Sequence, residues 1–363
     1  MNIALIVRKY QTSGGTERFT YNLSKFLSKN GHNVTIFCSK SNIIPPENVK
    51  IKRAFSIPIN RVIKTATFTY SIYKKDFSKF DIVQGCGKII KQDIYRAGGG
   101  FHKLYLKEIN REKLTFYDRM VISLEKKLYN TKNTKFVIAV SNLIKKEIIK
   151  EFGYPSERIV VFHNPVDLNQ FSPVSRENNL NKDLKLLFVA NNFKLKGLNS
   201  ILNVLKQLDN FKLFIVGGDN FENLKHGKIP EKLFKNIFFL GEKRGKELVK
   251  IYQQSDLLLH PTYFDPFANV CLEAMACGVP VVTTKINGAS EIIENYENGI
   301  VIEHAEDYNG LFNAVKKCIE NRELLLKMRE NCLKKIKEYS FEKYCKRLID
   351  FYQEVKKFKK SIE

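Results

Sequence analysis

The sequence predicts an α/β protein built from two similar halves, each a parallel β-sheet with helices on both faces. Short apolar runs alternate with amphipathic stretches along most of the chain, which is typical of strands joined by helical crossovers. The polar tract at 172–183 contains Pro173, has no periodicity and reads as a linker between the halves. With 363 residues the chain exceeds the usual size of a single hydrophobic core, so two domains are expected.

The first half begins with a strand, a glycine-containing loop and a helix. The helix is expected over 16–29, where Phe19, Leu23 and Leu27 recur at helical spacing, and Gly31 ends it. The expected strands are the apolar runs at 3–7, 34–38, 82–85, 136–140 and 159–163. This alternation predicts one Rossmann-like unit.

The second half repeats this alternation, with a helix expected over 198–208. Its expected strands are the runs at 186–190, 213–216, 237–240, 257–259 and 281–284. After Asp307 the chain is mainly helical and rich in lysine. We therefore expect an N-terminal Rossmann-like domain at 1–168, a second one at 169–340 and a C-terminal helix at 341–363.

Composition limits the classes of protein to consider. The seven cysteines are scattered and form no CxxC pair, which argues against a disulfide framework and a zinc site and favours a reducing compartment. The N-terminus shows no leader pattern and no apolar run is long enough to cross a bilayer, so a cytoplasmic protein is expected. The net charge of +23 calls for an anionic partner, although part of it can reflect a lysine-rich composition. No nucleic-acid-binding motif accompanies the charge, so no nucleic-acid partner is expected.

The segment at 256–282 combines a strand, a turn, a short helix and a second strand with two carboxylates. Asp265 is expected to cap the helix and Glu273 lies eight residues further on, while Gly278 and Pro280 end the helix. Eight residues of helix rise roughly 12 Å, so the two carboxylates could contact different parts of one extended ligand. The alternative is that Asp265 only caps the helix and Glu273 lies on its solvated face.

This segment resembles the signature of the retaining glycosyltransferases of family four, an acidic residue and a glutamate separated by seven residues. Asp265 stands where the family usually has glutamate. The likeness is greatest to the group that adds the first glucose to the lipopolysaccharide core. The resemblance implies a GT-B fold, in which two Rossmann-like domains face one another across a cleft and the C-terminal helix returns to the N-terminal domain. It further implies that Glu273 holds the ribose of a nucleotide sugar, and that Asp265 and the amides of Phe267, Ala268 and Asn269 hold its sugar.

The leaving diphosphate of such a donor needs neutralising charge. The sequence contains no Asp-x-Asp motif of the kind that binds a metal ion for this purpose, so no metal or other cofactor is expected. Lys196 matches the family lysine that contacts the diphosphate, in a loop at the carboxyl end of a strand, where ligands bind in open α/β sheets. The preceding family arginine is Leu195 here, and Lys194 is the candidate substitute. The alternative for both lysines is solvated surface charge.

Two glycine-rich segments of the first half are further candidates. Gly14 and Gly15 precede the first helix, match the first loop of the family and could present amides to the diphosphate, although glycine pairs are often ordinary turns. Arg18 on the same helix is a candidate acceptor contact or a surface ion pair. The tract at 93–108 would line the acceptor side through two glycines and a histidine, Gly99, Gly100 and His102.

The histidines and the hinge carry weaker signals. An aspartate proposed for catalysis in the related group falls at Gly99, so that role is not transferred, and His102 is the candidate replacement or a structural histidine. His260, at the end of a buried strand, reads as structural or interdomain. The residues at 162–167 resemble the family segment where the chain leaves the first domain.

Basic and apolar residues mix in the region 103–135. Sequence of this kind can lie on an anionic membrane, or its apolar stripe can pack on its own domain. The resemblance favours peripheral association with the inner face of the cytoplasmic membrane.

The expected function is metal-independent, retaining transfer of a hexose from a nucleotide sugar. The resemblance implies glucose from UDP-glucose and a saccharide or lipid-linked acceptor such as the lipopolysaccharide inner core. A family-four enzyme acting on capsule, O-antigen or another glycolipid remains an alternative. A nonenzymatic protein that binds nucleotide sugars and a basic nucleic-acid binder are alternatives from other classes.

Overall fold

The computed structural model describes residues 1–109, 111–175, 183–219 and 231–362. The chain forms two compact units: unit 1 comprises Met1–His163 and Glu342–Glu363, and unit 2 comprises Asn164–Phe341. The division follows His163 rather than residue 168, because the side-chain amide of Asn164 already bonds within unit 2, at 2.8 Å to Oδ1 of Asn269. Most of the expected linker at 172–183 lies outside the described residues.

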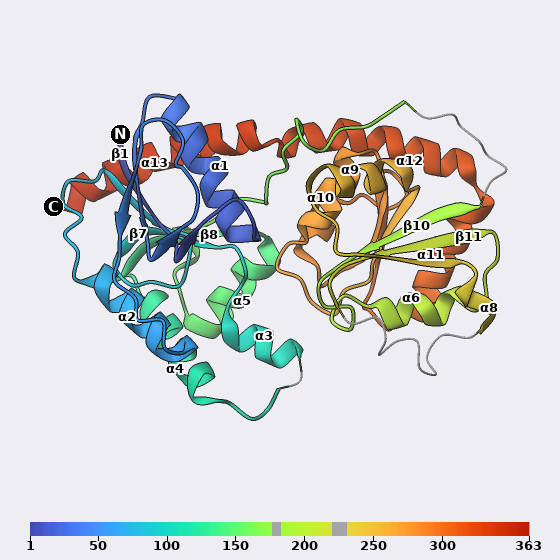
Figure 1. Ribbon diagram of the computed structural model, residues 1–363, viewed down its shortest axis with the longest axis horizontal. Helices are drawn as coiled ribbons and strands as arrows, with labels where there is room; N and C mark the ends of the chain where they lie inside the picture. The colour runs from blue at the N-terminus through green and yellow to red at the C-terminus, as the bar shows by residue number, and fades with distance from the viewer. Residues whose placement is uncertain (110, 176–182, 220–230, 363) are drawn as a thin grey trace. The chain divides into compact units, whose positions relative to one another are not determined.

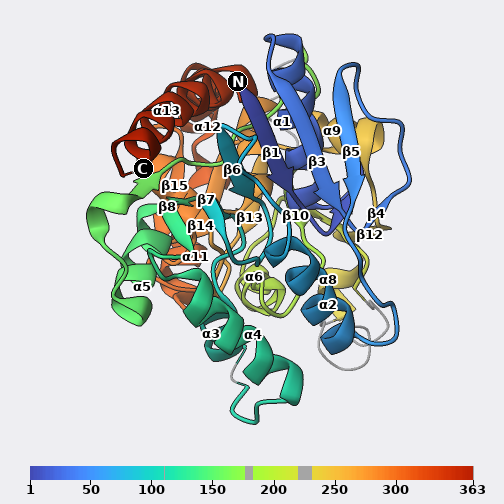
Figure 2. The same ribbon diagram turned by 90° about the vertical axis from the view of Figure 1, so that its left-hand side faces the viewer.

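Unit 1 contains a seven-stranded parallel sheet with the order β5-β3-β1-β6-β7-β8-β9. Figure 2 shows β6, β1, β3 and β5 side by side. Its strands are β1 (Asn2–Ile6), β3 (Asn33–Cys38), β5 (Val49–Arg53), β6 (Ile82–Gly85), β7 (Gln92–Ala97), β8 (Thr134–Ala139) and β9 (Ile159–Val161), and a separate pair is formed by β2 (Lys9–Tyr10) and β4 (Lys40–Ser41).

Helices cover both faces of this sheet. They are α1 (Gly15–Lys29), α2 (Arg61–Tyr73), α3 (His102–Glu108), α4 (Phe116–Leu128), α5 (Asn142–Phe152), the short η1 (Ser156–Arg158) and α13 (Phe341–Ile362). Phe68 and Ile72 of α2 pack with Ala4, Ile6 and Val83 of the sheet in one buried cluster. On α1, Phe19 makes an edge-to-face ring contact with Tyr344 of α13.

The C-terminal helix α13 is fixed to unit 1 by buried polar contacts as well as by apolar packing. The hydroxyl of Tyr352 lies 2.6 Å from Oε1 of Gln84, and both side chains are fully buried. Nζ of Lys359 lies 2.8 Å from the carboxylate of Asp93, which is also bonded by the amide of Val83. A buried carboxylate needs such partners, so these contacts specify where the helix packs.

Unit 2 contains a six-stranded parallel sheet with the order β12-β11-β10-β13-β14-β15. Its strands are β10 (Leu184–Val189), β11 (Phe211–Val216), β12 (Ile237–Gly241), β13 (Leu257–His260), β14 (Val281–Thr284) and β15 (Gly299–Ile302). Its helices are α6 (Leu198–Leu205), α8 (Glu231–Phe234), α9 (Gly245–Gln254), α10 (Asn269–Ala276), α11 (Tyr308–Glu320) and α12 (Arg322–Lys335), with η2 (Gly288–Ile292) and η3 (Ile336–Tyr339). In Figure 1, α6 and α11 lie on one face of this sheet and α9 and α10 on the other.

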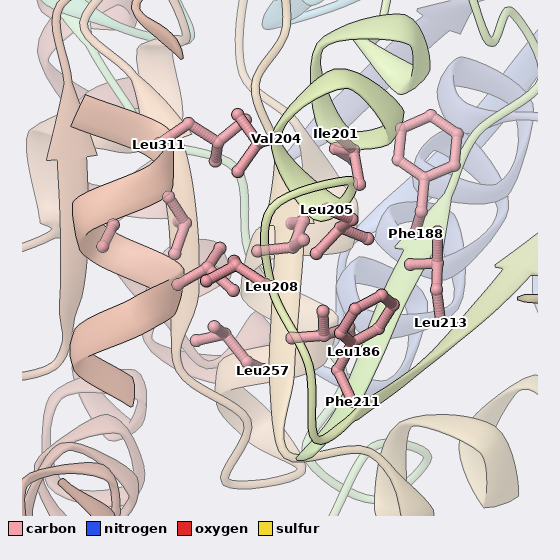
Figure 3. Close-up of a cluster of buried hydrophobic side chains, with 14 of the residues drawn as sticks. Leu186, Phe188, Ile201, Val204, Leu205, Leu208, Phe211, Leu213, Leu257 and Leu311 are labelled. Atoms are coloured by element: carbon pink, nitrogen blue, oxygen red, sulfur yellow. The ribbon is translucent and has the colours of Figure 1, made fainter. Parts of the chain in front are cut away.

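The core of unit 2 lies between its sheet and the helices α6 and α11. Figure 3 shows side chains from α6, such as Ile201 and Leu205, among Leu186, Phe188 and Leu213 of the strands. Burying one such side chain stabilises a fold by about 1.5–3 kcal/mol. The apolar face of α6 therefore holds the loop that precedes it firmly against the sheet.

The expected fold class is confirmed: each unit is a parallel, Rossmann-like sheet with helices on both faces. The short pair β2–β4 was not anticipated, nor were three strands of the two main sheets. β5 alternates lysine and arginine with apolar residues at the sheet edge, β15 begins with a glycine, and β7 falls in the tract expected to be a glycine-rich binding segment. Across the part of the chain that the structure describes, the helices lack the combination of length and apolar composition required to span a bilayer.

Candidate active site

The central feature of unit 2 is the point where its strand order reverses. Counted along the chain, the order is 3-2-1-4-5-6, so β10 and β13 are neighbours whose crossovers leave in opposite directions. In such a sheet, ligands bind beyond the carboxyl ends of the strands at this switch point. The loops that follow β10 and β13 carry Lys196 and Asp265, which makes this edge the candidate site.

Lys196 and Asp265 form a close ion pair across these two loops. Nζ of Lys196 lies 2.7 Å from Oδ2 of Asp265 and donates a second bond to the carbonyl oxygen of Phe264 at 3.0 Å. Both side chains are mostly buried, with exposed fractions of 18% and 17%. The structure thus brings together two residues that lie far apart in the sequence.

Gly197 allows the two loops to approach each other closely. It is the N-cap of α6, in the left-handed conformation with φ of 83°. A Cβ atom at this position would collide with the backbone carbonyl of Pro261. A side chain is therefore excluded both by the conformation and by the contact.

His260 completes the charged cluster from the end of β13. It is 2% exposed, and its Nε2 lies 3.7 Å from Oδ2 of Asp265. Neither ring nitrogen has a hydrogen-bond partner among the described residues. Burial lowers the pKa of His260, which favours the neutral imidazole.

Asp265 is held in its ionised form. Burial by itself would raise its pKa, but the ammonium group of Lys196 outweighs that effect and lowers the pKa to about 2. The carboxylate is therefore a permanent acceptor at neutral pH. A polyhydroxy ligand is a suitable partner for such an acceptor.

Asp265 does not cap the following helix, contrary to the expectation. Helix α10 begins at Asn269 after the N-cap residue Ala268, and no side chain caps it. Oδ1 of Asp265 instead accepts from the amide of Phe267 at 3.1 Å, within the loop. Pro266, Phe267 and Ala268 lie before the helix, and Ala268 is extended, so the two carboxylates are not separated by eight residues of helix.

The amides expected to hold a donor sugar are partly engaged within the protein. The amide of Ala268 donates to Oδ1 of Asn287 at 3.1 Å, and that of Phe267 bonds Asp265. The side chain of Asn269 accepts from Asn164. For the amide of Phe267 or Ala268 to bind a sugar, it would have to give up its present hydrogen bond and donate to the sugar instead.

Glu273 lies on α10 and is buried, with an exposed fraction of 6%. The hydroxyl of Tyr252, on α9, donates to its Oε2 at 3.1 Å. Burial, followed by the nearby Glu273 carboxylate, raises the pKa of Tyr252, so its hydroxyl stays protonated and remains a donor. Tyr252 therefore fixes the orientation of the carboxylate.

In unit 1 the predicted glycine loop also lies at a switch point, between β1 and β6. Gly14 is the N-cap of α1, with φ of 89°, and Gly15 is the first residue of the helix. Both are exposed, and the amide of Arg18 donates to the carbonyl of Gly14 at 2.9 Å. The amides at this helix end are in a position suited to an anion.

The other predicted segment of unit 1 follows β7, which is separated from β1 by β6 in the sheet. Gly99 is exposed, and Gly100 has a positive φ of 64° that turns the chain into α3. At the end of β7, the guanidinium of Arg96 lies 3.8 Å from the ring centre of Phe19 on α1. This cation–π contact joins β7 to α1, the two elements next to the candidate loops.

His102 is the first residue of α3 and belongs to a hydrogen-bonded cluster. Its Nε2 lies 2.8 Å from Oδ1 of Asp118, and its amide donates to Oε1 of Glu125 at 2.7 Å. Asp118 also forms a capping box with Thr115 at the start of α4. The hydrogen bonds from Thr115, followed by those from His102 and the charge of Arg111, lower the pKa of Asp118. The carboxylate therefore orients the imidazole.

Two family models match the chain in succession. The model described as Glycosyltransferase Family 4 matches residues 13–170, and the one described as Glycosyl transferases group 1 matches residues 172–339. The chain is a glycosyltransferase of the family 4, group 1 type.

Curated relatives agree with this assignment. One uncharacterized glycosyltransferase of Methanocaldococcus jannaschii is 25% identical over 394 residues, covering 96% of this chain and 95% of that protein. Another from the same organism is 31% identical over 178 residues, covering 45% of this chain and 46% of that protein. This chain therefore spans less than half the length of the second relative.

Solved structures show that the glycosyltransferase has the GT-B fold. WaaG, a glycosyltransferase involved in lipopolysaccharide biosynthesis, superimposes with a TM-score of 0.78 at 20% identity, covering 96% of this chain and 99% of that one. Anabaena HepE in complex with UDP-glucose gives a TM-score of 0.72 at 17% identity, covering 98% and 100%. At these identities the likeness concerns the fold.

The structure places the predicted residues of the glycosyltransferase in three groups. Lys196 and Asp265 form one group, Glu273 lies on the following helix, and the glycines, Arg18 and His102 lie along the carboxyl edge of the unit 1 sheet. Lys194 is exposed. Groups of three or more His, Cys, Asp or Glu side chains arranged to hold a metal ion do not occur within the described residues.

The sequence indicated Asn164 only as part of the segment 162–167 where the chain leaves the first domain. It did not indicate four other residues that position these groups: Tyr252, Asp118, Glu125 and Asn287. The capping-box spacing of Thr115 and Asp118 is a readable signal for one of them. The others are brought to the site only by tertiary packing.

Proposed function

We propose that this glycosyltransferase transfers glucose from UDP-glucose to a saccharide or lipid-linked acceptor with retention of the anomeric configuration. The observation that carries the proposal is the Lys196–Asp265 pair at the switch point of unit 2. It places a cation and a carboxylate side by side, which suits a ligand with both an anionic and a polyhydroxy part. The complex of Anabaena HepE with UDP-glucose, on the same fold, supports this choice of donor.

Binding of the donor would separate Lys196 from Asp265, and each side chain would then bind a different part of the donor. Lys196 lies 2.7 Å from the carboxylate in the free protein. A diphosphate carries more negative charge than one carboxylate, so it would attract the ammonium group and release Asp265 to accept from the sugar hydroxyls. Glu273, oriented by Tyr252, would accept from the ribose hydroxyls.

The chemical step needs charge stabilisation on the leaving diphosphate. We propose that Lys196, rather than a metal ion, supplies it. In unit 1, the amides of Gly14 and Gly15 at the start of α1 are proposed separately as anion-binding donors. The acceptor oxygen bonds to the anomeric carbon on the face that the diphosphate leaves. The carbon–oxygen bond to the diphosphate breaks, and the acceptor proton passes to the departing phosphate oxygen.

Unit 1 would contribute acceptor contacts. His102 is held by Asp118 with its ring oriented, which suits a hydrogen bond to a hydroxyl of the acceptor. Arg18, Gly99 and Gly100 lie along the same sheet edge and are proposed to complete this contact.

The acceptor proposed is the lipopolysaccharide inner core. The fold likeness to WaaG, which is involved in lipopolysaccharide biosynthesis, supports this choice. Such an acceptor is membrane-linked, and we propose that the protein binds peripherally to the inner face of the cytoplasmic membrane through the basic region 103–135.

Nucleotide binding tests the donor site directly. Isothermal titration with UDP and UDP-glucose should show binding. Lys196→Met should weaken the affinity by roughly 10- to 100-fold, which corresponds to the free energy of one charge-assisted hydrogen bond. Lys194→Met measures whether the neighbouring lysine contributes, and Lys206→Met, an exposed lysine on the far end of α6, is the matched control.

Glu273→Gln should weaken UDP binding similarly, whereas Glu247→Gln, an exposed residue of α9, should not. Transfer is then assayed with a truncated lipid acceptor, and the anomeric configuration of the product is determined by NMR. Absence of UDP binding together with absence of transfer from a panel of nucleotide sugars would overturn the proposal. A product of opposite anomeric configuration would overturn retention.

A further inference from the structure

Unit 1 contains a large groove that the proposed chemistry does not use. It has a volume of about 950 Å³ and lies between α2 and α4. Its lining residues come from these two helices and from the chain beside them: Thr65, Ala66, Thr69, Tyr70, Tyr73, Ile90, Phe116, Arg119, Met120, Ser123, Leu124, Lys127 and Asn133. A volume of this size is at the upper end of the range for small-molecule sites.

The groove is walled by apolar side chains that the unit leaves uncovered. Phe116 is 73% exposed, Tyr70 63% and Tyr73 48%. Folding does not gain from leaving large aromatic side chains in water, and such patches mark places where another apolar surface binds. The patch is continuous because Met120 and Leu124 lie beside these rings along the groove.

The groove face of α4 is distinct from the face that packs on the unit. Val121 and Leu128 are buried in the unit. Phe116, Met120 and Leu124, spaced by four residues, form a second apolar stripe that lines the groove. Helix α4 therefore has more apolar surface than its own unit covers.

The charged side chains among the lining residues of the groove are cationic. Arg119 and Lys127 line it, and its lining includes no aspartate or glutamate. Nζ of Lys74 lies 5.6 Å from the ring centre of Tyr70, and Nζ of Lys91 lies 6.0 Å from that of Tyr73. The combination of an apolar floor and a cationic rim is complementary to a molecule with a hydrocarbon part and an anionic head.

The groove also contains polar atoms suited to the junction between these two parts. The hydroxyl groups of Thr65 and Thr69 are buried and have no hydrogen-bond partner among the described residues. Thr69 is 6% exposed. A buried hydroxyl without a partner is unfavourable, and the carbonyl oxygen of an ester or amide could accept from it.

We propose that the groove between α2 and α4 binds a hydrocarbon chain of an anionic membrane lipid, with Arg119 and Lys127 contacting the headgroup phosphate. This inference rests on the proposed membrane association and deepens it, because it assigns the contact to a groove that includes α2 rather than to the region 103–135 alone. It does not depend on which sugar is transferred.

The absence of tryptophan from the sequence makes a sharp test possible. Phe116→Trp and Tyr70→Trp each place a single fluorophore at the groove, and Tyr308→Trp places one at a 43% exposed position on α11 as the matched control. Each full-length variant is titrated with vesicles of equal parts phosphatidylcholine and phosphatidylglycerol, with normal or brominated acyl chains, and with phosphatidylcholine alone.

The proposal predicts a blue shift and bromine quenching at 116 and 70 with anionic vesicles, and neither effect at 308. Ala66→Phe, at an exposed groove position, should fill the groove and weaken vesicle binding about tenfold. Arg119→Gln and Lys127→Gln should each weaken it by about fivefold, with a loss of salt dependence. Circular dichroism of each variant is the check that it is folded.

The failures are distinguishable. Binding to anionic vesicles without quenching at 116 and 70, or with equal quenching at 308, would overturn the proposal that the groove binds the acyl chain. It would leave membrane association itself standing. Binding that Ala66→Phe does not weaken would do the same and would point to the basic surface alone. Absence of binding to every vesicle would overturn both, whereas transfer to a soluble truncated acceptor would remain open to its own assay.

Discussion

Replacing Asp265 with asparagine should reduce the stability of unit 2 in a way that depends on pH. The carboxylate lies 2.7 Å from Nζ of Lys196 and is 17% exposed, so this ion pair is largely withdrawn from solvent. Burial opposes ionisation, but the ammonium group of Lys196 lowers the pKa of Asp265 to about 2, from an ordinary value of 3.8. The ionised form is therefore more favourable in the folded protein than in the unfolded chain.

The magnitude follows from the difference between the two pKa values. A depression of this size corresponds to roughly 2 kcal/mol of stability, fully present above pH 3.8 where both states are ionised. Between pH 3.8 and 2 the unfolded chain takes up a proton that the folded protein does not, so the contribution falls. About half of it is lost at pH 3 and nearly all of it below pH 2.

Urea unfolding of the full-length protein can measure this. A Tyr308→Trp background supplies a single fluorophore in unit 2, so the transition of that unit is followed selectively. The free energy of unfolding of the wild type should exceed that of Asp265→Asn by about 2 kcal/mol at pH 7 and by about 1 kcal/mol at pH 3. Glu247→Gln, which removes an exposed pair with Lys243, should change the free energy of unfolding by less than about 1 kcal/mol.

The same pair can be tested by a double-mutant cycle. In a Lys196→Met background, Asp265→Asn should have a smaller effect, because the partner that holds the carboxylate ionised is gone. If the free energies of unfolding of wild type and Asp265→Asn differ by the same amount at pH 7 and pH 3, Lys196 does not hold this carboxylate in its ionised form.

Three further substitutions test the supports of the two units. Tyr252→Phe removes the hydroxyl that donates to Glu273 and should weaken UDP binding by about tenfold with an unchanged circular dichroism spectrum; unchanged affinity would exclude a positioning role. Gly197→Ala should destabilise the protein by roughly 1–3 kcal/mol in thermal unfolding, and by more than Gly153→Ala, because both glycines have positive φ but only Gly197 is crowded. Lys359→Met removes the 2.8 Å partner of the buried Asp93 carboxylate, which keeps Lys135 at 3.6 Å and the amide of Val83, so it should cost about 1–3 kcal/mol and speed amide exchange in α13; normal protection of that helix would contradict this.

Much of the fold was predictable because apolar runs and turn residues act locally. The runs at 82–85 and 281–284 match β6 and β14 in both bounds, and the helix expected over 16–29 begins one residue early, at Gly15. The strands that were not predicted are those whose formation depends on pairing with the adjacent strand of the sheet. β5 is a lysine-rich edge strand whose pairing with β3 is set by the sheet, and β15 pairs beside β14 in the same way.

The glycosyltransferase assignment was predictable because a short motif carries the family resemblance. The interval between Asp265 and Glu273 and the loop containing Lys196 resemble the family pattern, and the family models agree that the chain is a glycosyltransferase. The roles of the individual site residues stay predictions. The expected helix cap at Asp265 was wrong, because the carboxylate is better satisfied by Lys196 and by the amide of Phe267 than by the first turn of a helix four residues away.

The amino-acid sequence by itself determined the two Rossmann-like units and the residue types of the site, since periodicity, turns and motif spacing depend on neighbours along the chain. Only the tertiary structure decided that Lys196 faces Asp265, that Tyr252 holds Glu273, that Asp118 holds His102, and that α2 and α4 leave a cationic apolar groove. These contacts join segments that are distant in the sequence. They form only where strand order and helix packing bring the segments to the same edge of a sheet.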